Sequence, residues 1–173
     1  MKFRLLKESE IECRVKQCTE KGAVLLLYKD ARTDMNILDE AVGAEFWESD
    51  YKEIKGNLYC GIGIWSNARN AMIWKWDCGI ESREDGDGNQ KKGEASDAFK
   101  RAGFKWGIGR ELYSAPFIFI RPDMVNIIRG ERKCVTYDTF SIEKIAYDED
   151  CKISGIAIRN DKTGKRCFVW QKQ

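Results

Sequence analysis

The residues best suited to chemistry are cations and aromatic rings between Lys91 and Pro116, in the segment KKGEASDAFKRAGFKWGIGRELYSAP. Lys100 and Arg101 are adjacent, and Lys105 follows one helical turn after Arg101. Arg110 comes directly after a Gly-Ile-Gly turn. Ammonium and guanidinium groups spaced in this way bind successive phosphates of a nucleic-acid backbone.

An aromatic ring accompanies these cations. At 100° per residue, Phe104 lies between Lys100 and Arg101 on one side of a helix, where it would stack on a base. Lys91 and Lys92 add positive charge just upstream. A second interpretation stays open, because a helix rich in Lys and Arg often does no more than present its charged face to solvent.

The distribution of charge indicates more than its total. The net charge of +2 is too small to point to a nucleic-acid partner. Residues 30–53 hold eight acidic side chains against Arg32 and Lys52, whereas residues 91–110 hold six basic side chains against two acidic ones. We expect one acidic and one basic surface.

Most catalytic chemistries lack their usual residues. The chain has no histidine, which removes the commonest general base. Metal-dependent nuclease activity would need clustered carboxylates, and the candidates are expected in solvated turns or at strand edges. We therefore expect no enzyme activity, no metal and no cofactor. The candidate carboxylates are Glu48 with Asp50, Asp85 with Asp87, and Asp148 to Asp150.

The seven cysteines are irregularly spaced and include no Cys-x-x-Cys pair. An odd number argues against a disulfide framework, and the spacing argues against a structural zinc site. We expect buried free thiols in a reducing compartment. No apolar run is long enough to span a bilayer.

The elements that must position the cations have an α+β pattern. An N-terminal hairpin and a helix precede an antiparallel β-meander, in which the three strands are joined by turn signals. The helix has Met35, Leu38 and Val42 at helical spacing, and Gly43 ends it. The expected ranges are 11–18 and 23–29 for the hairpin, 31–42 for the helix, and 47–55, 58–65 and 71–80 for the meander.

The last strand of the meander alternates clearly. One face carries its apolar side chains, and Lys75 and Asp77 lie on the other. This favours packing of Trp74 and Trp76 in the core, while Trp65 is undecided between core and base stacking. The apolar face consists of Met72, Trp74, Trp76, Cys78 and Ile80.

A polar stretch, 82–92, is expected to be an exposed mobile loop before a helix over 93–106. Paired glycines in Gly61-Ile62-Gly63 and Gly107-Ile108-Gly109 lack the context of a dinucleotide site, and indicate close backbone approach and a left-handed turn. Residues 132–170 look like short strands. We expect one domain, with an annealing-type core over 1–130 and a C-terminal β extension over 131–173. The helix stripe is Ala95, Ala98, Phe99, Ala102 and Trp106, and the C-terminal turns are at Asp148–Asp150 and Asp161–Gly164.

Residues 96–102, Ser-Asp-Ala-Phe-Lys-Arg-Ala, followed by Gly107-Ile108-Gly109-Arg110, resemble a family signature. The family is the Rad fifty-two superfamily of single-strand annealing proteins, especially its phage (Sak) and DdrA-like members. The order of the upstream elements is similar too, including an aromatic corner at Phe46-Trp47. The likeness covers roughly residues 20–120 and implies a β-β-β-α core.

The resemblance implies a groove for single-stranded DNA that runs around a ring or arc of subunits. In that family the adjacent Lys-Arg pair contributes to the groove, which corresponds here to Lys100 and Arg101. A further basic residue of eukaryotic members corresponds to Phe104, so that contact is missing or replaced by Lys105. An Arg just before the first helix corresponds approximately to Arg32.

The function implied is single-stranded DNA binding and ATP-independent annealing of complementary strands in recombination and repair. The protein would be phage-encoded and act in the host cytoplasm as a homo-oligomer. A single-strand binding protein or an exonuclease would be its partner. The alternative is a protein that coats single-stranded DNA without annealing it, because basic and aromatic residues alone do not separate the two.

Overall fold

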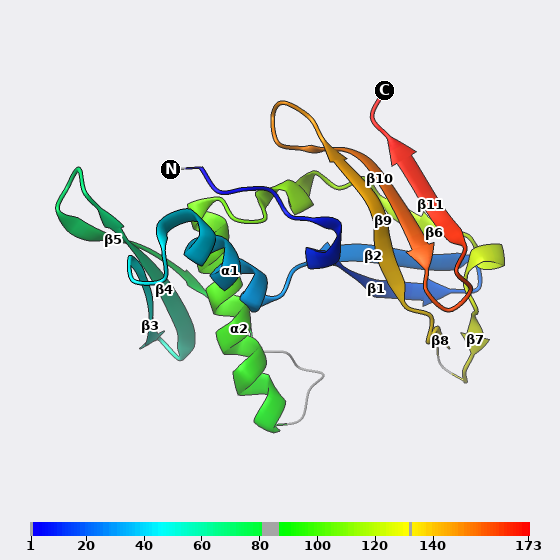
Figure 1. Ribbon diagram of the computed structural model, residues 1–173. Coiled ribbons are helices and arrows are strands. Elements are labelled where there is room, and N and C mark those ends of the chain that lie inside the picture. Colours follow the sequence, from blue (N-terminus) through cyan, green and yellow to red (C-terminus); the bar gives the residue numbers. More distant parts are fainter. Residues whose placement is uncertain (1, 81–86, 132) are drawn as a thin grey trace. The chain divides into compact units, whose positions relative to one another are not determined.

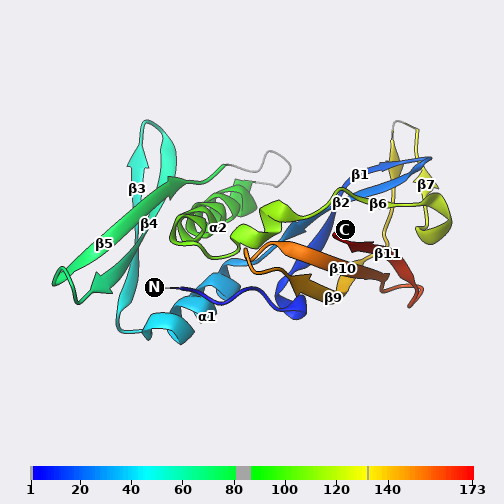
Figure 2. The same ribbon diagram turned by 90° about the horizontal axis from the view of Figure 1, so that it is seen from above.

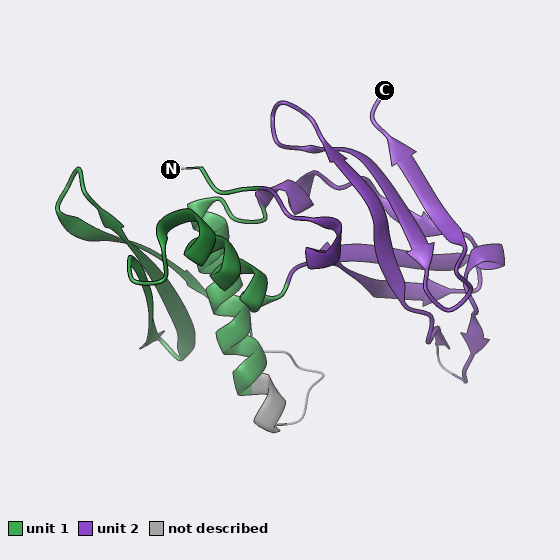
Figure 3. Cartoon of the chain, in the orientation of Figure 1, with its two compact units in different colours: residues 1–4, 30–109 green, residues 5–29, 110–173 purple. Residues whose placement is uncertain are grey.

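Contacts divide the chain into two compact units, and each is described by itself (Figure 3). The computed structural model describes residues 2–80, 87–131 and 133–173, with the backbone alone at 87–90. The first unit consists of residues 1–4 and 30–109, and the second of residues 5–29 and 110–173.

The first unit is the predicted meander and its helices (Figure 1). Strands β3, β4 and β5 form an antiparallel sheet with β4 in the centre. Helix α2 packs against one face of this sheet, and the two views of the ribbon show that face covered (Figures 1 and 2). The α+β class and the order of its elements are confirmed. The bounds are α1 Ala31–Val42, β3 Trp47–Ile54, β4 Asn57–Ser66, β5 Ala71–Cys78 and α2 Asp87–Trp106.

Helix α1 begins and ends where the sequence predicts. The Asp30 carboxylate accepts a hydrogen bond from the Thr33 backbone N–H at 3.0 Å, which caps the first turn. Gly43 ends the helix with φ at 91°. The buried face was predicted wrongly in part. Leu38 is fully buried, as predicted. The other fully buried apolar residue of this helix is Ile37, whereas Met35 is 37% exposed.

Helix α2 begins at Asp87 rather than at Gly93, so residues 87–92 of the predicted loop are helical. Residues 82–86 of that loop lie outside the described part of the chain. The predicted stripe is confirmed at Ala98, Phe99 and Ala102, which are buried. Small side chains let the helix approach closely, because a Cβ on Gly79 would lie 2.2 Å from the Glu94 carbonyl oxygen.

The second unit is a nearly closed six-stranded sheet in the order β11-β10-β9-β1-β2-β6, in which β11 lies against β6. The predicted hairpin is β1 (Glu12–Thr19) with β2 (Gly22–Tyr28). The C-terminal strands extend this hairpin through two residue pairs between β1 and β9. The other elements are η1 Glu8–Glu10, η2 Arg110–Ser114, β6 Ile118–Ile120, η3 Pro122–Met124, β7 Ile128–Arg129, β8 Cys134–Val135, β9 Phe140–Tyr147, β10 Ile153–Asn160 and β11 Arg166–Gln171.

Buried polar groups fix the irregular stretch between β6 and β9. Asn160 is fully buried and donates to the Asp138 carboxylate at 2.8 Å and to the Met124 carbonyl oxygen at 3.1 Å. The same carboxylate accepts the Asn126 backbone N–H at 2.8 Å. These hydrogen bonds offset part of the cost of burial, although the Oδ1 atom of Asp138 is buried without a partner among the described residues.

The cysteines carry free thiols. Only Cys60 is fully buried, and the others are half-buried, so the predicted burial is correct in part. Burial raises the pKa of the Cys13 thiol to about 12 and that of the Cys60 thiol to about 11. Within the described residues, no helix is both long and apolar enough to cross a membrane.

Candidate nucleic-acid interface

The structure brings four of the predicted site residues together on the last turns of α2. They are Lys100, Arg101, Phe104 and Lys105. Lys91 and Lys92 are exposed on an earlier part of the same helix. The remaining two lie elsewhere: Arg32 in the first turn of α1, and Arg110 at the start of η2 in the second unit.

Arg101 and Lys105 lie along the outer edge of β5 and share one carboxylate. Asp77 is 3.5 Å from the Arg101 guanidinium and 3.8 Å from the Lys105 ammonium. The Lys105 ammonium also donates to the Trp76 carbonyl oxygen. The single carboxylate neutralises only one of the two positive charges, and both cationic side chains are about half exposed. This edge of the sheet therefore keeps a net positive charge.

The N–H groups of the Arg101 guanidinium are not all used in hydrogen bonds within the described part of the chain. Its Nε is buried and has no acceptor among the described residues, and its bond to Asp77 is long at 3.5 Å. A guanidinium carries five N–H donors in a planar fork, which suits a phosphate. A small shift toward an incoming phosphate would therefore exchange a weak bond for a stronger one.

Lys100 lies one residue from Arg101 and so points about 100° away from it around the helix. Within residues 2–80, 87–131 and 133–173 its ammonium has no ion-pair partner within 4.0 Å. Phe104 is half-buried on the arc between the two cations. The helix thus presents a cation, an aromatic ring and a second cation around its outer side.

Lys75 was assigned to the solvent face, and the structure corrects this. Its ammonium lies 4.2 Å from the centre of the Trp106 ring and donates to the Lys105 carbonyl oxygen at 3.1 Å. A cation at this position offsets the negative end of the helix dipole. The side chains of Lys75 and Asp77 therefore face α2, and the predicted inside and outside of β5 are reversed.

Trp74 and Trp76 do share a face, as predicted, but it is the face that α2 does not cover. Their ring centres are 5.5 Å apart, and the rings are inclined by 25°. They lie over the two glycines of β4: a Cβ on Gly61 would be 2.5 Å from Trp76, and one on Gly63 would be 2.8 Å from Trp74. Both indoles are half-buried rather than packed in a core.

The same open face, opposite α2, carries a mixture of aromatic and charged side chains. The register of the three strands defines its members. Lys52 from β3 places its ammonium 4.2 Å from the centre of the Trp76 ring. Trp65 is 36% exposed and donates from Nε1 to Asn67 at 3.0 Å, which places this undecided residue on the surface. The open face consists of Glu48, Asp50, Lys52, Ile54, Tyr59, Gly61, Gly63, Trp65, Met72, Trp74, Trp76 and Cys78.

The sequence did contain a signal for this face. A close approach does occur at Gly61 and Gly63, but the atoms that approach belong to side chains, chiefly the rings of Trp76 and Trp74, with which these glycines pair in register. The expected left-handed turn after α2 is confirmed, because φ is 111° at Gly107 and 76° at Gly109. Glycine opposite tryptophan in adjacent strands marks rings that lie flat on the backbone.

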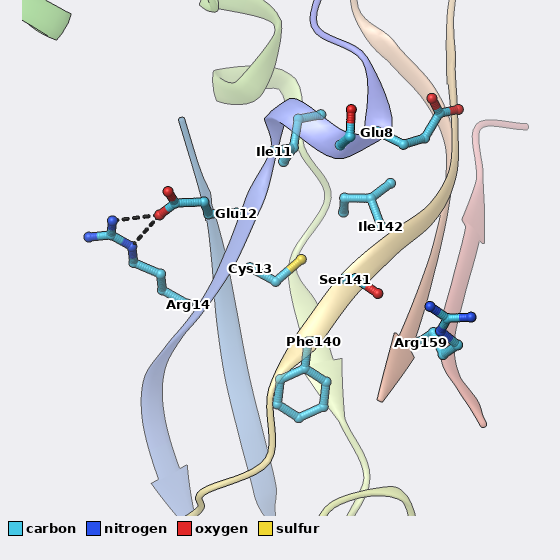
Figure 4. Close-up of a pocket in the computed structure, with 10 residues that line it drawn as sticks. Glu8, Ile11, Glu12, Cys13, Arg14, Phe140, Ser141, Ile142 and Arg159 are labelled. Atoms are coloured by element: carbon cyan, nitrogen blue, oxygen red, sulfur yellow. Dashed lines mark hydrogen bonds and ion pairs between the residues drawn. The ribbon is translucent and has the colours of Figure 1, made fainter. Parts of the chain in front are cut away.

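A shallow depression in the second unit is a weaker candidate (Figure 4). It lies where β1 and β9 diverge after two residue pairs. Its two guanidinium groups already face acidic partners: Arg14 binds Glu12 at 2.5 Å, and Arg159 lies 3.8 Å from Asp161. Neither guanidinium is therefore left without an acidic partner for binding an anionic ligand.

Among the described residues, the carboxylates weighed as nuclease ligands do not form a metal-binding group. The described residues contain no group of three or more His, Cys, Asp or Glu side chains that could hold a metal ion. Asp148 is bound by Lys172 at 2.8 Å, and that ammonium holds the pKa of the carboxyl below its usual value. Asp85 lies outside the described residues, as does the side chain of Asp87.

Comparisons with known proteins found no match among family models, curated proteins or solved structures.

Proposed function

We propose that this protein binds single-stranded DNA and anneals complementary strands without ATP, as an oligomer. The observation that carries the proposal is the cluster of Lys100, Arg101, Phe104 and Lys105 on the outer side of α2, next to the edge of β5. The resemblance of residues 96–102 to single-strand annealing proteins supports the same function.

The chemistry is electrostatic. Cations along α2 bind phosphates and release condensed counterions, which makes binding favourable and dependent on salt. Two complementary strands repel each other through their phosphates, and a positive surface offsets that repulsion while the bases test their pairing. Annealing breaks no covalent bond, so a nucleophile is not required.

Oligomerisation follows from the size of the cluster. Three cations on one helix contact only a few phosphates, and so one subunit binds a strand weakly. Several subunits on the same strand add their affinities through effective concentration. Separate acidic and basic surfaces would suit a head-to-tail contact between copies, which generates rings when the rotation closes.

The test is to mix two complementary labelled oligonucleotides at low salt, without ATP or metal, and to follow duplex formation with and without the protein. We expect acceleration, and loss of acceleration as salt is raised. Binding without acceleration would identify a coating protein instead. The absence of binding would contradict the proposal altogether.

A further inference from the structure

The open face of the β3-β4-β5 sheet has no covering element within the described part of the first unit. It nevertheless carries two indoles in an ordered arrangement. Gly61 and Gly63 leave space for Trp76 and Trp74 to lie over the backbone of β4, since any Cβ there would overlap the rings. Rings fixed in this way are preorganised, so little conformational entropy is lost when a planar ligand stacks on them.

We propose that Trp74 and Trp76 form a stacking platform for unpaired bases of the strand whose phosphates Arg101 and Lys105 bind. The inference rests on the proposed function and adds to it how the bases are held. Aromatic stacking accepts every base, because every base has a π-face. It also requires single strands, since the bases of a duplex are already stacked and paired.

The cations and the indoles are adjacent across the edge of β5. The Lys105 ammonium binds the backbone carbonyl oxygen of Trp76 itself, and Asp77 next to it holds Arg101. The two cations therefore lie at the same strand edge from which the Trp76 ring extends onto the open face. Phosphate and base are the two ends of one nucleotide, and this edge offers a partner to each.

The charged side chains of the open face further define the path of the DNA strand. Glu48 and Asp50 lie on β3, separated from β5 by the whole width of β4. Asp50 forms an ion pair with the Lys52 ammonium at 3.6 Å, so the Glu48 carboxylate is the one that repels phosphates from the β3 side of the open face. The Lys52 ammonium lies 4.2 Å from the centre of the Trp76 ring, so a base that stacks on this ring must displace it. The DNA strand is thus directed along β5, where aromatic rings and cations lie next to one another.

The edges of the sheet are less suited to a second copy than its face. The Tyr51 backbone N–H at the β3 edge is bound by the Asp50 carboxylate at 2.8 Å. The Cys78 backbone N–H is bound by Asp77 at 2.9 Å. Edge donors occupied in this way are not available for pairing with another strand. These two occupied donors make strand addition less favourable at the edges, which agrees with stacked bases as the occupant of the open face.

The experiment titrates the full-length protein with single-stranded oligothymidylate, following both tryptophan fluorescence and the anisotropy of a labelled oligonucleotide. We expect quenching on binding. Replacing Trp74→Leu and Trp76→Leu together should remove most of the quenching and weaken affinity at least about fivefold. The salt slope should stay unchanged, because no cation is lost. Trp170→Leu, on β11 of the second unit, is the matched control and should bind as the wild type does.

A second measurement covers the case in which the double variant does not fold. In the wild-type protein, the indole N–H resonances of Trp74 and Trp76 should shift on adding oligothymidylate, and single Trp→Phe variants assign them. Binding at full affinity with both resonances unmoved would overturn the stacking proposal alone. No binding at all would overturn the proposed function as well.

An interface between copies gives a different result. If the double Leu variant folds, changes its mass by light scattering and keeps wild-type affinity per bound subunit, the rings contact a second copy instead of bases. That outcome also overturns the proposal.

Discussion

The two faces of the β3-β4-β5 sheet are built by the same alternation but have opposite environments. On the face that α2 covers, Cys60 and Ile62 are fully buried and Ile64 is 2% exposed. On the open face the larger rings of Trp74 and Trp76 lie half-buried over glycines. The face with the most aromatic surface is therefore not the core, and the Lys52 ammonium lies over one of these two indoles, Trp76.

The covered face also holds polar side chains. Lys75 packs its ammonium over Trp106, and Asp77 accepts two cations from α2. A long side chain can bury its stem against a helix while its charge finds a partner. Alternation along a strand therefore indicates which side chains share a face. The element that packs on the sheet determines which of the two faces is buried in the core.

The largest expected effect is on the covered face. Ile62→Ala removes a fully buried side chain beneath α2 and should lower the free energy of unfolding by about 2–5 kcal/mol. Urea denaturation measures this loss. Val169→Ala, at a 63% exposed position, is the control and should change little. A loss below about 1 kcal/mol for Ile62→Ala would mean that this face is not the core.

Gly61→Ala should have the next largest effect, because it acts through the open face. The new methyl would lie 2.5 Å from the Trp76 ring, so the indole must move off the backbone. We expect destabilisation of about 1–3 kcal/mol, together with weaker binding of single-stranded DNA. Gly93→Ala, with no atom within 4 Å of its added methyl, should stabilise α2 instead. Equal effects at Gly61 and Gly93 would contradict the placement of the Trp76 indole over the backbone of Gly61.

The thiols of the two faces should differ in reactivity. Burial raises the pKa of Cys60 to about 11, whereas Cys78 lies half-buried on the open face. The thiolate is the reactive form, and a raised pKa lowers its fraction at pH 8. We expect Cys78 to react with a disulfide reagent at least about tenfold faster than Cys60. Mass spectrometry of peptides after brief labelling would measure both rates, and faster modification of Cys60 would contradict the assignment of faces.

The smallest expected effect concerns the acidic side of the open face. Glu48→Gln removes a negative charge that repels phosphates there, and should tighten single-strand binding by about twofold while changing stability by less than about 0.5 kcal/mol. Glu53→Gln is the matched control, because Glu53 is exposed on the same strand but its side chain alternates to the other face. Equal changes in affinity would indicate that the strand does not cross the open face.

Much of the fold could be predicted because local signals were strong. Asp30 and Gly43 delimit α1, and turn residues separate the strands of the meander. The start of α2 was missed because the polar residues 87–92 have no apolar repeat, although they continue the helix that begins at Asp87. Met35 was misassigned because its spacing to Leu38 fits a helix stripe whose centre is set by the packing of Ile37.

The candidate site could be predicted only in its cations. Lys100, Arg101 and Lys105 follow from spacing on one helix. Their relation to the indoles could not, because it depends on the pairing of β4 with β5 and on which face α2 covers. Gly61 opposite Trp76 was the one local sign of that arrangement.

The most direct test of the account is the salt dependence of single-strand binding. Lys100→Ala with Arg101→Ala removes two proposed phosphate contacts and should reduce the slope of log affinity against log salt by about 1.4. The control is Lys144→Ala with Lys162→Ala, which removes the same charge from exposed positions of the second unit. We expect a reduced slope for the first pair and an unchanged slope for the second. An unchanged slope for Lys100→Ala with Arg101→Ala would contradict the assignment of α2 as the DNA-binding element.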